Sequence, residues 1–172
     1  LDAAENARLR EITETAPAYA AWDKVGRHAK DESAIGLHLD AVLANPLVKP
    51  DLVRKRSFTV VADCINAAGG AVVPELLRRL GCTVIAMNDD VGGVFARPPE
   101  PLPENLGALR DAVKARRADL GIAVDPDVDR LVFITEKGEP FGEEYTVTAA
   151  IDYVLGAGPR GGKTVVNLST TR

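Results

Sequence analysis

The sequence predicts an α/β fold: a three-layer α/β/α domain with a mixed, partly parallel sheet, preceded by an N-terminal helical segment. Two observations support this prediction. From Ser57 onward, short runs of β-branched and apolar residues alternate with helix-length segments, as in parallel strands joined by helical crossovers. These runs are continuously apolar, which is typical of strands buried on both faces of a sheet.

The first part of the chain, residues 1–52, is expected to form helices and no strand. Residues 2–14 are rich in helix formers and precede a proline. A second helix is predicted in KDESAIGLHLDAVLANPLV, with Asp31 or Ser33 as its N-cap and Asn45 at its end. Because two helices are too little for an independent core, we assign residues 1–52 to the end of a preceding domain and a linker.

The main domain is predicted over residues 53–158 and begins with a βαβ unit. FTVVAD has the composition of a buried strand, AVVPELLRRLG is a helix that Gly81 ends, and CTVIAM is the next strand. Strands joined in this way pair in parallel through a right-handed crossover. Gly69 and Gly70 lie between strand and helix, and a tight turn explains them more simply than a phosphate cradle.

The rest of this domain is predicted to add a helix, two strands and a last helix. The proline-punctuated loop RPPEPLPEN leads into the amphipathic helix NLGALRDAVKARR. The strands ADLGIAVD and RLVFITEKG follow, and then the helix GEEYTVTAAIDYVLGAG. The chain ends in GGKTVVNLSTTR, which has the pattern of one more buried strand. We therefore expect residues 159–172 to be the first strand of a truncated following domain.

The composition argues against two classes of partner. The 21 basic and 25 acidic residues give a net charge of −4, which is unlike a nucleic-acid-binding domain. No apolar run in the sequence approaches the ~20 residues of a membrane helix. Cys64 and Cys82 lack metal-ligand spacing and are expected to be reduced, buried thiols. The prediction is a cytoplasmic protein that binds neither nucleic acid nor membrane.

Three aspartates at alternate positions, Asp125, Asp127 and Asp129, follow a buried-type strand and directly precede Arg130. Two carboxylates about 4 Å apart repel each other by roughly 4 kcal/mol at the effective dielectric of a protein surface. A loop that gathers three carboxylates must therefore spread into water, take up protons or bind a cation.

Four interpretations of this loop compete. A solvated acidic turn would not require the alternate spacing. An EF-hand calcium loop matches in its acidic positions, with Glu136 as the last ligand, but Arg130 stands where the turn requires glycine. A haloacid-dehalogenase-like phosphotransferase would use Asp125 as nucleophile and Asp127 as general acid/base, but the other parts of that fold are missing downstream.

The fourth interpretation, a divalent-metal loop that serves phosphoryl transfer, fits best. Mg²⁺ prefers hard oxygen ligands and leaves coordination positions for a phosphate. The guanidinium of Arg130 is suited to hold a phosphate beside the ion. We therefore predict Asp125, Asp127 and Asp129 as ligands of Mg²⁺. A non-catalytic α/β binding domain that keeps the loop as an acidic turn stays open as the rival class.

Several motifs resemble the α-D-phosphohexomutases, which include phosphomannomutase, phosphoglucomutase and phosphoglucosamine mutase. DPDVDR, with ADLGIAVD before it and GEEYTVTAAIDYVL after it, is similar to the family's metal loop and its flanks. VADCINAAGG and PPEPLPENL resemble the family's second-domain opening strand and the loop before its metal-side helix. The usual family loop is Asp-Gly-Asp-x-Asp-Arg, in which Pro126 here replaces the glycine. The resemblance covers residues 19–172.

The resemblance implies a four-domain enzyme of which this chain is mainly domain two. In that family a phosphoserine of domain one donates its phosphoryl group to a hexose monophosphate, and the bisphosphorylated sugar returns the other phosphate to the serine. By resemblance, Asp125, Asp127 and Asp129 bind Mg²⁺ and Arg130 contacts the phosphoserine. A hexose phosphate and the missing domains one, three and four are then the partners. No Ser-His-Asn-Pro phosphoserine loop occurs in the sequence, so the chain alone is expected to be inactive.

Overall fold

The computed structural model describes residues 2–15, 19–157 and 162–166 of the chain. Two compact units are present, Leu1–Glu32 and Ser33–Arg172. In the first unit, helix α1 (Ala3–Glu14) is followed by the short 3₁₀ helix η1 (Trp22–Lys24). A capping box starts α1, because the backbone amide of Glu5 donates to Asp2 while the amide of Asp2 donates to Glu5. The helix predicted over residues 2–14 is confirmed.

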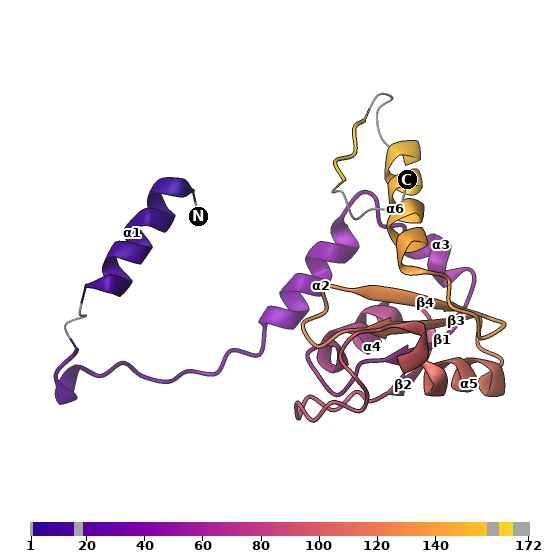
Figure 1. Cartoon of the computed structure of the whole chain (residues 1–172), viewed down its shortest axis with the longest axis horizontal. Coiled ribbons are helices and arrows are strands. Elements are labelled where there is room, and N and C mark those ends of the chain that lie inside the picture. The colour runs from indigo at the N-terminus through magenta and orange to yellow at the C-terminus, as the bar shows by residue number, and fades with distance from the viewer. Residues whose placement is uncertain (1, 16–18, 158–161, 167–172) are drawn as a thin grey trace. The chain divides into compact units, whose positions relative to one another are not determined.

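The second unit is built on a four-stranded mixed sheet (Figure 1). Strand β1 pairs in parallel with β2 and with β3, and β3 pairs antiparallel with β4. All four strands match predicted strands, and the βαβ unit has the predicted parallel pairing. In spatial order the strands are β2 (Thr83–Met87), β1 (Thr59–Asp63), β3 (Leu120–Val124) and β4 (Leu131–Thr135).

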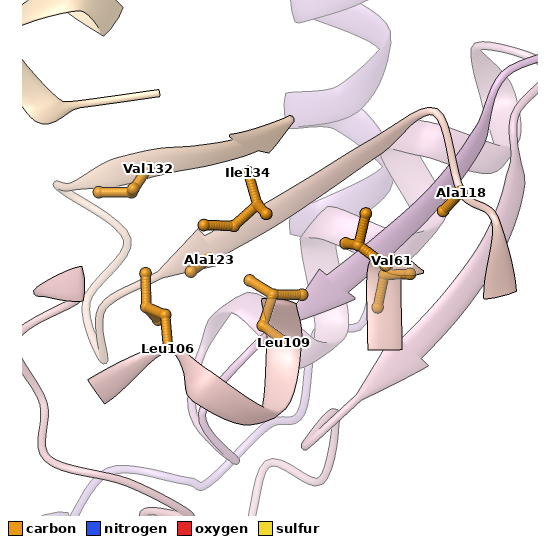
Figure 2. Close-up of a cluster of buried hydrophobic side chains, with 8 residues drawn as sticks. Val61, Leu106, Leu109, Ala118, Ala123, Val132 and Ile134 are labelled. Carbon is orange, nitrogen blue, oxygen red and sulfur yellow. The ribbon is translucent and has the colours of Figure 1, made fainter. Parts of the chain in front are cut away.

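Helices cover both faces of this sheet, as the predicted three-layer fold requires. A hydrophobic core lies on each face of the sheet. Successive residues of β1 point alternately into the two cores, because side chains of a strand alternate between faces. Val60 and Ala62 pack with Leu77 of α4 (Gly69–Arg79). Val61 packs with residues of α5 (Gly107–Arg116) in the second core, where Leu106 and Leu109 face Ala123, Val132 and Ile134 (Figure 2).

Among its described residues, the second unit also holds the α-helices α2 (Ala34–Ala44), α3 (Pro50–Arg54) and α6 (Glu143–Ala157) and the 3₁₀ helix η2 (Pro103–Asn105). Helix α2 contacts α4, and α6 contacts β4. The five-residue helix α3 was not predicted. The compact unit that holds the sheet therefore begins before residue 52. The assignment of residues 1–52, 53–158 and 159–172 to three domains of a longer enzyme stays a prediction.

Only part of the chain's end, residues 162–166, is described, so the strand expected over residues 159–172 stays a prediction. Residues 162–166 form no strand, and Val165 is 96% exposed. Residues 158–161 and 167–172, which hold the rest of the expected strand, lie outside the described residues. Within the described part of the chain, no helix is long and apolar enough to cross a membrane.

Candidate metal-binding loop

The acidic loop lies at the carboxyl edge of the sheet. Parallel strands β1, β2 and β3 all end at this edge, and β3 ends at Val124, directly before Asp125. Strand β4 returns antiparallel from Leu131, so the loop of residues 125–130 joins two hydrogen-bonded strands. The carboxyl edge of a parallel sheet is where α/β proteins commonly place their functional groups. The fold thus presents the predicted ligands at such an edge.

The structure brings the three predicted ligands together. One carboxylate oxygen from each of Asp125, Asp127 and Asp129 lies within 4.8 Å of the others. Asp125 is 6% exposed, whereas Asp127 and Asp129 face solvent. Three carboxylates, two of them open to water, form a hard-oxygen donor set of the kind that holds Mg²⁺ with part of its hydration shell retained. The residues present therefore fit a magnesium ion.

The neighbouring aspartates shift the pKa of Asp129. Its pKa is raised, first by a hydrogen bond with the Asp125 side chain and then by the negative charges of Asp127 and Asp125. A raised pKa means that Asp129 holds a proton more readily than a free aspartate does when no cation offsets the neighbouring charges. The cluster thus has the electrostatic character of a cation site.

The backbone of the loop is tightly turned. The amide of Val128 donates to the carbonyl of Asp125 at 3.3 Å, and the amide of Arg130 donates to Oδ1 of Asp125 at 3.1 Å. Val128 has a φ of +64°, a left-handed conformation that is unfavourable for a β-branched residue. Pro126 restricts the backbone of the same turn. This conformation places the carboxylates on either side of Val128 in one cluster.

The start of α4 also contacts the loop. The amide of Ala68 donates to the carbonyl of Pro126 at 3.3 Å. The two glycines that follow allow close backbone approach, since a Cβ on Gly70 would lie 2.2 Å from the carbonyl oxygen of Asp89. A Cβ on Gly69 would lie 2.7 Å from Cγ2 of Val124. The two glycines are the first residues of α4 and not part of a turn, so close packing, and not the tight turn expected from the sequence, explains them.

Arg130 lies beside the cluster. Its Nε is 3.9 Å from Oδ2 of Asp125 and 3.8 Å from Oδ1 of Asp129, and its Nη1 forms an ion pair with Glu100. The side chain is 43% exposed, so the guanidinium remains accessible from solvent. Its predicted role as a phosphate contact is compatible with this position and stays a prediction.

Two residues of the proline-punctuated loop near the site were missed in the sequence. Glu100 contacts Arg130, and Arg97 is buried against Asp63 at the carboxyl end of β1. The sequence offered a weak signal, a pair of opposite charges among prolines, but no periodicity that would place them at the sheet edge. The sequence pattern therefore predicts only a connector here.

Comparison with known proteins points to one family. The family model for phosphoglucomutase/phosphomannomutase, alpha/beta/alpha domain II, matches residues 37–138. A probable phosphoglucosamine mutase of Methanopyrus kandleri is 39% identical over 155 residues, which are 89% of this chain and 33% of that protein. A phosphoglucomutase/phosphomannomutase of Thermococcus kodakarensis is 40% identical over 137 residues, which cover 79% of this chain and 29% of that protein.

Solved structures show the same similarity. A phosphoglucomutase/phosphomannomutase family protein from Burkholderia thailandensis superposes with a TM-score of 0.60 at 26% identity, over 71% of this chain and 26% of that one. This chain thus spans about a third or less of the length of the proteins that it matches.

Proposed function

Because the chain belongs to the phosphoglucomutase/phosphomannomutase family, as its α/β/α domain II, we propose that it supplies the Mg²⁺-binding loop of a phosphohexomutase. The parent enzyme interconverts hexose 1-phosphate and hexose 6-phosphate through a phosphoserine and a bisphosphorylated sugar. The names of the matched relatives, phosphoglucosamine mutase and phosphoglucomutase/phosphomannomutase, support this reaction class. The substrate is a hexose phosphate.

The single observation that carries the proposal is the convergence of three carboxylates beside a half-exposed arginine. Asp125, Asp127 and Asp129 are the residues that would hold Mg²⁺. When bound, the ion supplies positive charge that offsets the charge of a phosphate, which is the main requirement of phosphoryl transfer. The loop itself contributes positioning, because the amide of Arg130 and the turn at Val128 fix the carboxylate of Asp125.

Arg130 is the proposed contact of this chain with the phosphoserine. A guanidinium donates two parallel hydrogen bonds to a phosphate, and its charge stays fixed at any physiological pH. Glu100 holds the guanidinium beside the loop when no phosphate is present. A dianionic phosphate has more charge than this exposed carboxylate, so it competes well for the same donors.

The other parts of the reaction belong to the rest of the proposed enzyme. The phosphoserine of domain one and the sugar and phosphate loops of domains three and four are the intramolecular partners of this domain. Residues 1–52 and 159–172 are proposed to connect to those domains, on either side of the α/β domain over residues 53–158. The proposed location is the cytoplasm, and the proposed partners include neither nucleic acid nor membrane.

A metal titration tests the site on this chain. Binding of Mn²⁺, followed by electron paramagnetic resonance, should weaken at least about tenfold in Asp127→Asn, since one charged ligand becomes a neutral one. The variant should keep its fold, because it removes a like charge beside Asp129. Asp111→Asn, an exposed carboxylate on α5, is the matched control and should bind like the parent. Equal binding by the parent and Asp127→Asn would remove the loop as the metal site.

A further inference from the structure

We propose that Arg97 is a positioning residue that fixes the point at which the metal loop leaves the sheet. The proposal rests on the function proposed above and adds a residue outside the loop. The side chain of Arg97 is only 8% exposed, although it comes from the irregular proline-rich segment between β2 and α5. A guanidinium is rarely buried without a specific set of partners, and these partners indicate its role.

The guanidinium bonds to two different strands. Its Nε donates to Oδ2 of Asp63 at 2.9 Å, and its Nη2 donates to the carbonyl oxygen of Val124 at 2.7 Å. Its Nη1 donates within its own segment, to the carbonyls of Pro98 at 3.2 Å and Pro99 at 3.4 Å. The planar, forked shape of arginine allows all of these bonds at once. Arg97 thus joins β1, β3 and the proline-rich segment.

Asp63 connects this arginine to the third parallel strand. The residue ends β1 and is 3% exposed. Its Oδ1 accepts from the backbone amide of Ile65 at 3.0 Å and from the side-chain amide of Asn88 at 3.0 Å. Asn88 directly follows the last residue of β2. One buried ion pair therefore links the carboxyl ends of β1, β2 and β3.

The bond to Val124 lies where the parallel pairing ends. The register between β1 and β3 runs from Val60 with Leu120 to Asp63 with Ala123, so Val124 is one residue beyond the last pair. On its other side Val124 is paired with Leu131 of β4. Arg97 takes the place of a β1 partner at this position. The residue that follows is Asp125, the buried member of the proposed ligand set.

This arrangement affects metal binding more than a contact elsewhere in the core would. A metal site requires its ligands to be held within about 0.5 Å of their working positions by the residues behind them. Loss of such supporting partners typically weakens metal binding about 10- to 100-fold. Without the bond from Arg97, the carbonyl of Val124 loses its side-chain connection to the end of β1, so the adjoining ligand is held less firmly.

The conservative variant Arg97→Lys tests the proposal. Lysine keeps the positive charge beside Asp63, but a single ammonium cannot reproduce the planar fork to Asp63 and Val124. Mn²⁺ affinity, measured by electron paramagnetic resonance on the 172-residue chain, should fall about tenfold while the circular dichroism spectrum stays that of a folded protein. Arg79→Lys is the matched control, because Arg79 also forks to two carboxylates, Asp40 at 2.7 Å and Glu75 at 2.9 Å.

The control should lose stability without a change in Mn²⁺ affinity. Unchanged Mn²⁺ affinity in Arg97→Lys would overturn the proposal. So would an equal loss of Mn²⁺ affinity in Arg97→Lys and Arg79→Lys when the two variants lose the same stability. If Arg97→Lys does not fold, the double variant Asp63→Asn, Arg97→Gln removes both buried charges together. Mn²⁺ affinity equal to that of the parent in this folded variant would also overturn the proposal.

Asp127→Asn separates the two hypotheses. Loss of Mn²⁺ binding in Asp127→Asn with full binding in Arg97→Lys contradicts only the role of Arg97. Equal binding by Asp127→Asn and the parent contradicts the metal site itself.

Discussion

Gly69 at the start of α4 lies directly against Val124 at the end of β3. A Cβ on Gly69 would stand 2.7 Å from Cγ2 of Val124, closer than real carbon atoms approach, and 3.6 Å from Cγ2 of Val128. The absence of a side chain at this position lets the helix start contact both the strand end and the acidic loop of residues 125–130. The position therefore couples the packing of α4 to the loop.

Gly69→Ala is predicted to destabilise the protein. The added methyl group must push apart α4 and β3 at a packed contact, which typically costs about 1–3 kcal/mol of unfolding free energy. Gly36→Ala is the control, since Gly36 lies inside α2 and has nothing within 4 Å of its Cβ position. That change should stabilise by about 0.5–1 kcal/mol through helix propensity. Urea unfolding of both variants measures the difference, and changes of the same sign would contradict the packing argument.

Val128→Gly is predicted to leave stability almost unchanged, although valine normally contributes packing. The left-handed backbone costs a non-glycine residue about 1–2 kcal/mol, and glycine removes that cost. The saving should offset the lost contacts, for a net change below about 1 kcal/mol. Val84→Gly, at a partly buried valine in the extended strand β2, should instead lose about 2 kcal/mol or more. Equal losses in thermal unfolding would mean that Val128 is not strained.

The sequence predicted the sheet and the grouping of the three aspartates because both depend on local patterns. β-Branched runs give the strands, and alternate spacing in a loop between two strands brings Asp125, Asp127 and Asp129 together. The support behind the loop could not be predicted in this way. Arg97 meets Asp63 across 34 residues and Val124 across 27, through a segment without periodicity. Helix α3, which begins with a proline, could not be predicted either, because its five residues are too few to show a periodic pattern.

The unfolding free energy is predicted to fall at alkaline pH because of the buried thiol of Cys64. This thiol is fully buried, and burial, followed by the charges of Asp63 and Asp89, raises its pKa from 9.0 to about 12. Between pH 9 and 12 the unfolded chain loses a proton that the folded chain keeps, so the unfolding free energy should fall as pH rises. The slope approaches about 1.4 kcal/mol per pH unit for this one group. Urea unfolding at pH 8 and pH 10 should show a smaller fall in Cys64→Ala than in the parent, and equal falls would contradict the assignment.

The 172-residue chain is predicted not to interconvert hexose phosphates. In the proposed mechanism the phosphoryl donor is a serine outside this chain, and removal of one member of a group that acts as a unit abolishes turnover almost completely. Asp125, the nucleophile in the haloacid-dehalogenase-like alternative, is poorly placed to attack. It is 6% exposed, its Oδ1 accepts the amide of Arg130 at 3.1 Å, and its Oδ2 lies 3.9 Å from Nε of Arg130.

A coupled assay with glucose 1-phosphate, a catalytic amount of glucose 1,6-bisphosphate and Mg²⁺ measures this activity. The expected rate equals that of Mg²⁺ without protein, and Asp125→Ala should give the same rate as the parent chain. The proposal would be contradicted if the parent chain showed turnover above that background, Asp125→Ala abolished it and Asp111→Ala on α5 retained it. Such a result would make Asp125 the attacking group, because a carboxylate that only binds a metal supplies no phosphoryl acceptor when the serine is absent.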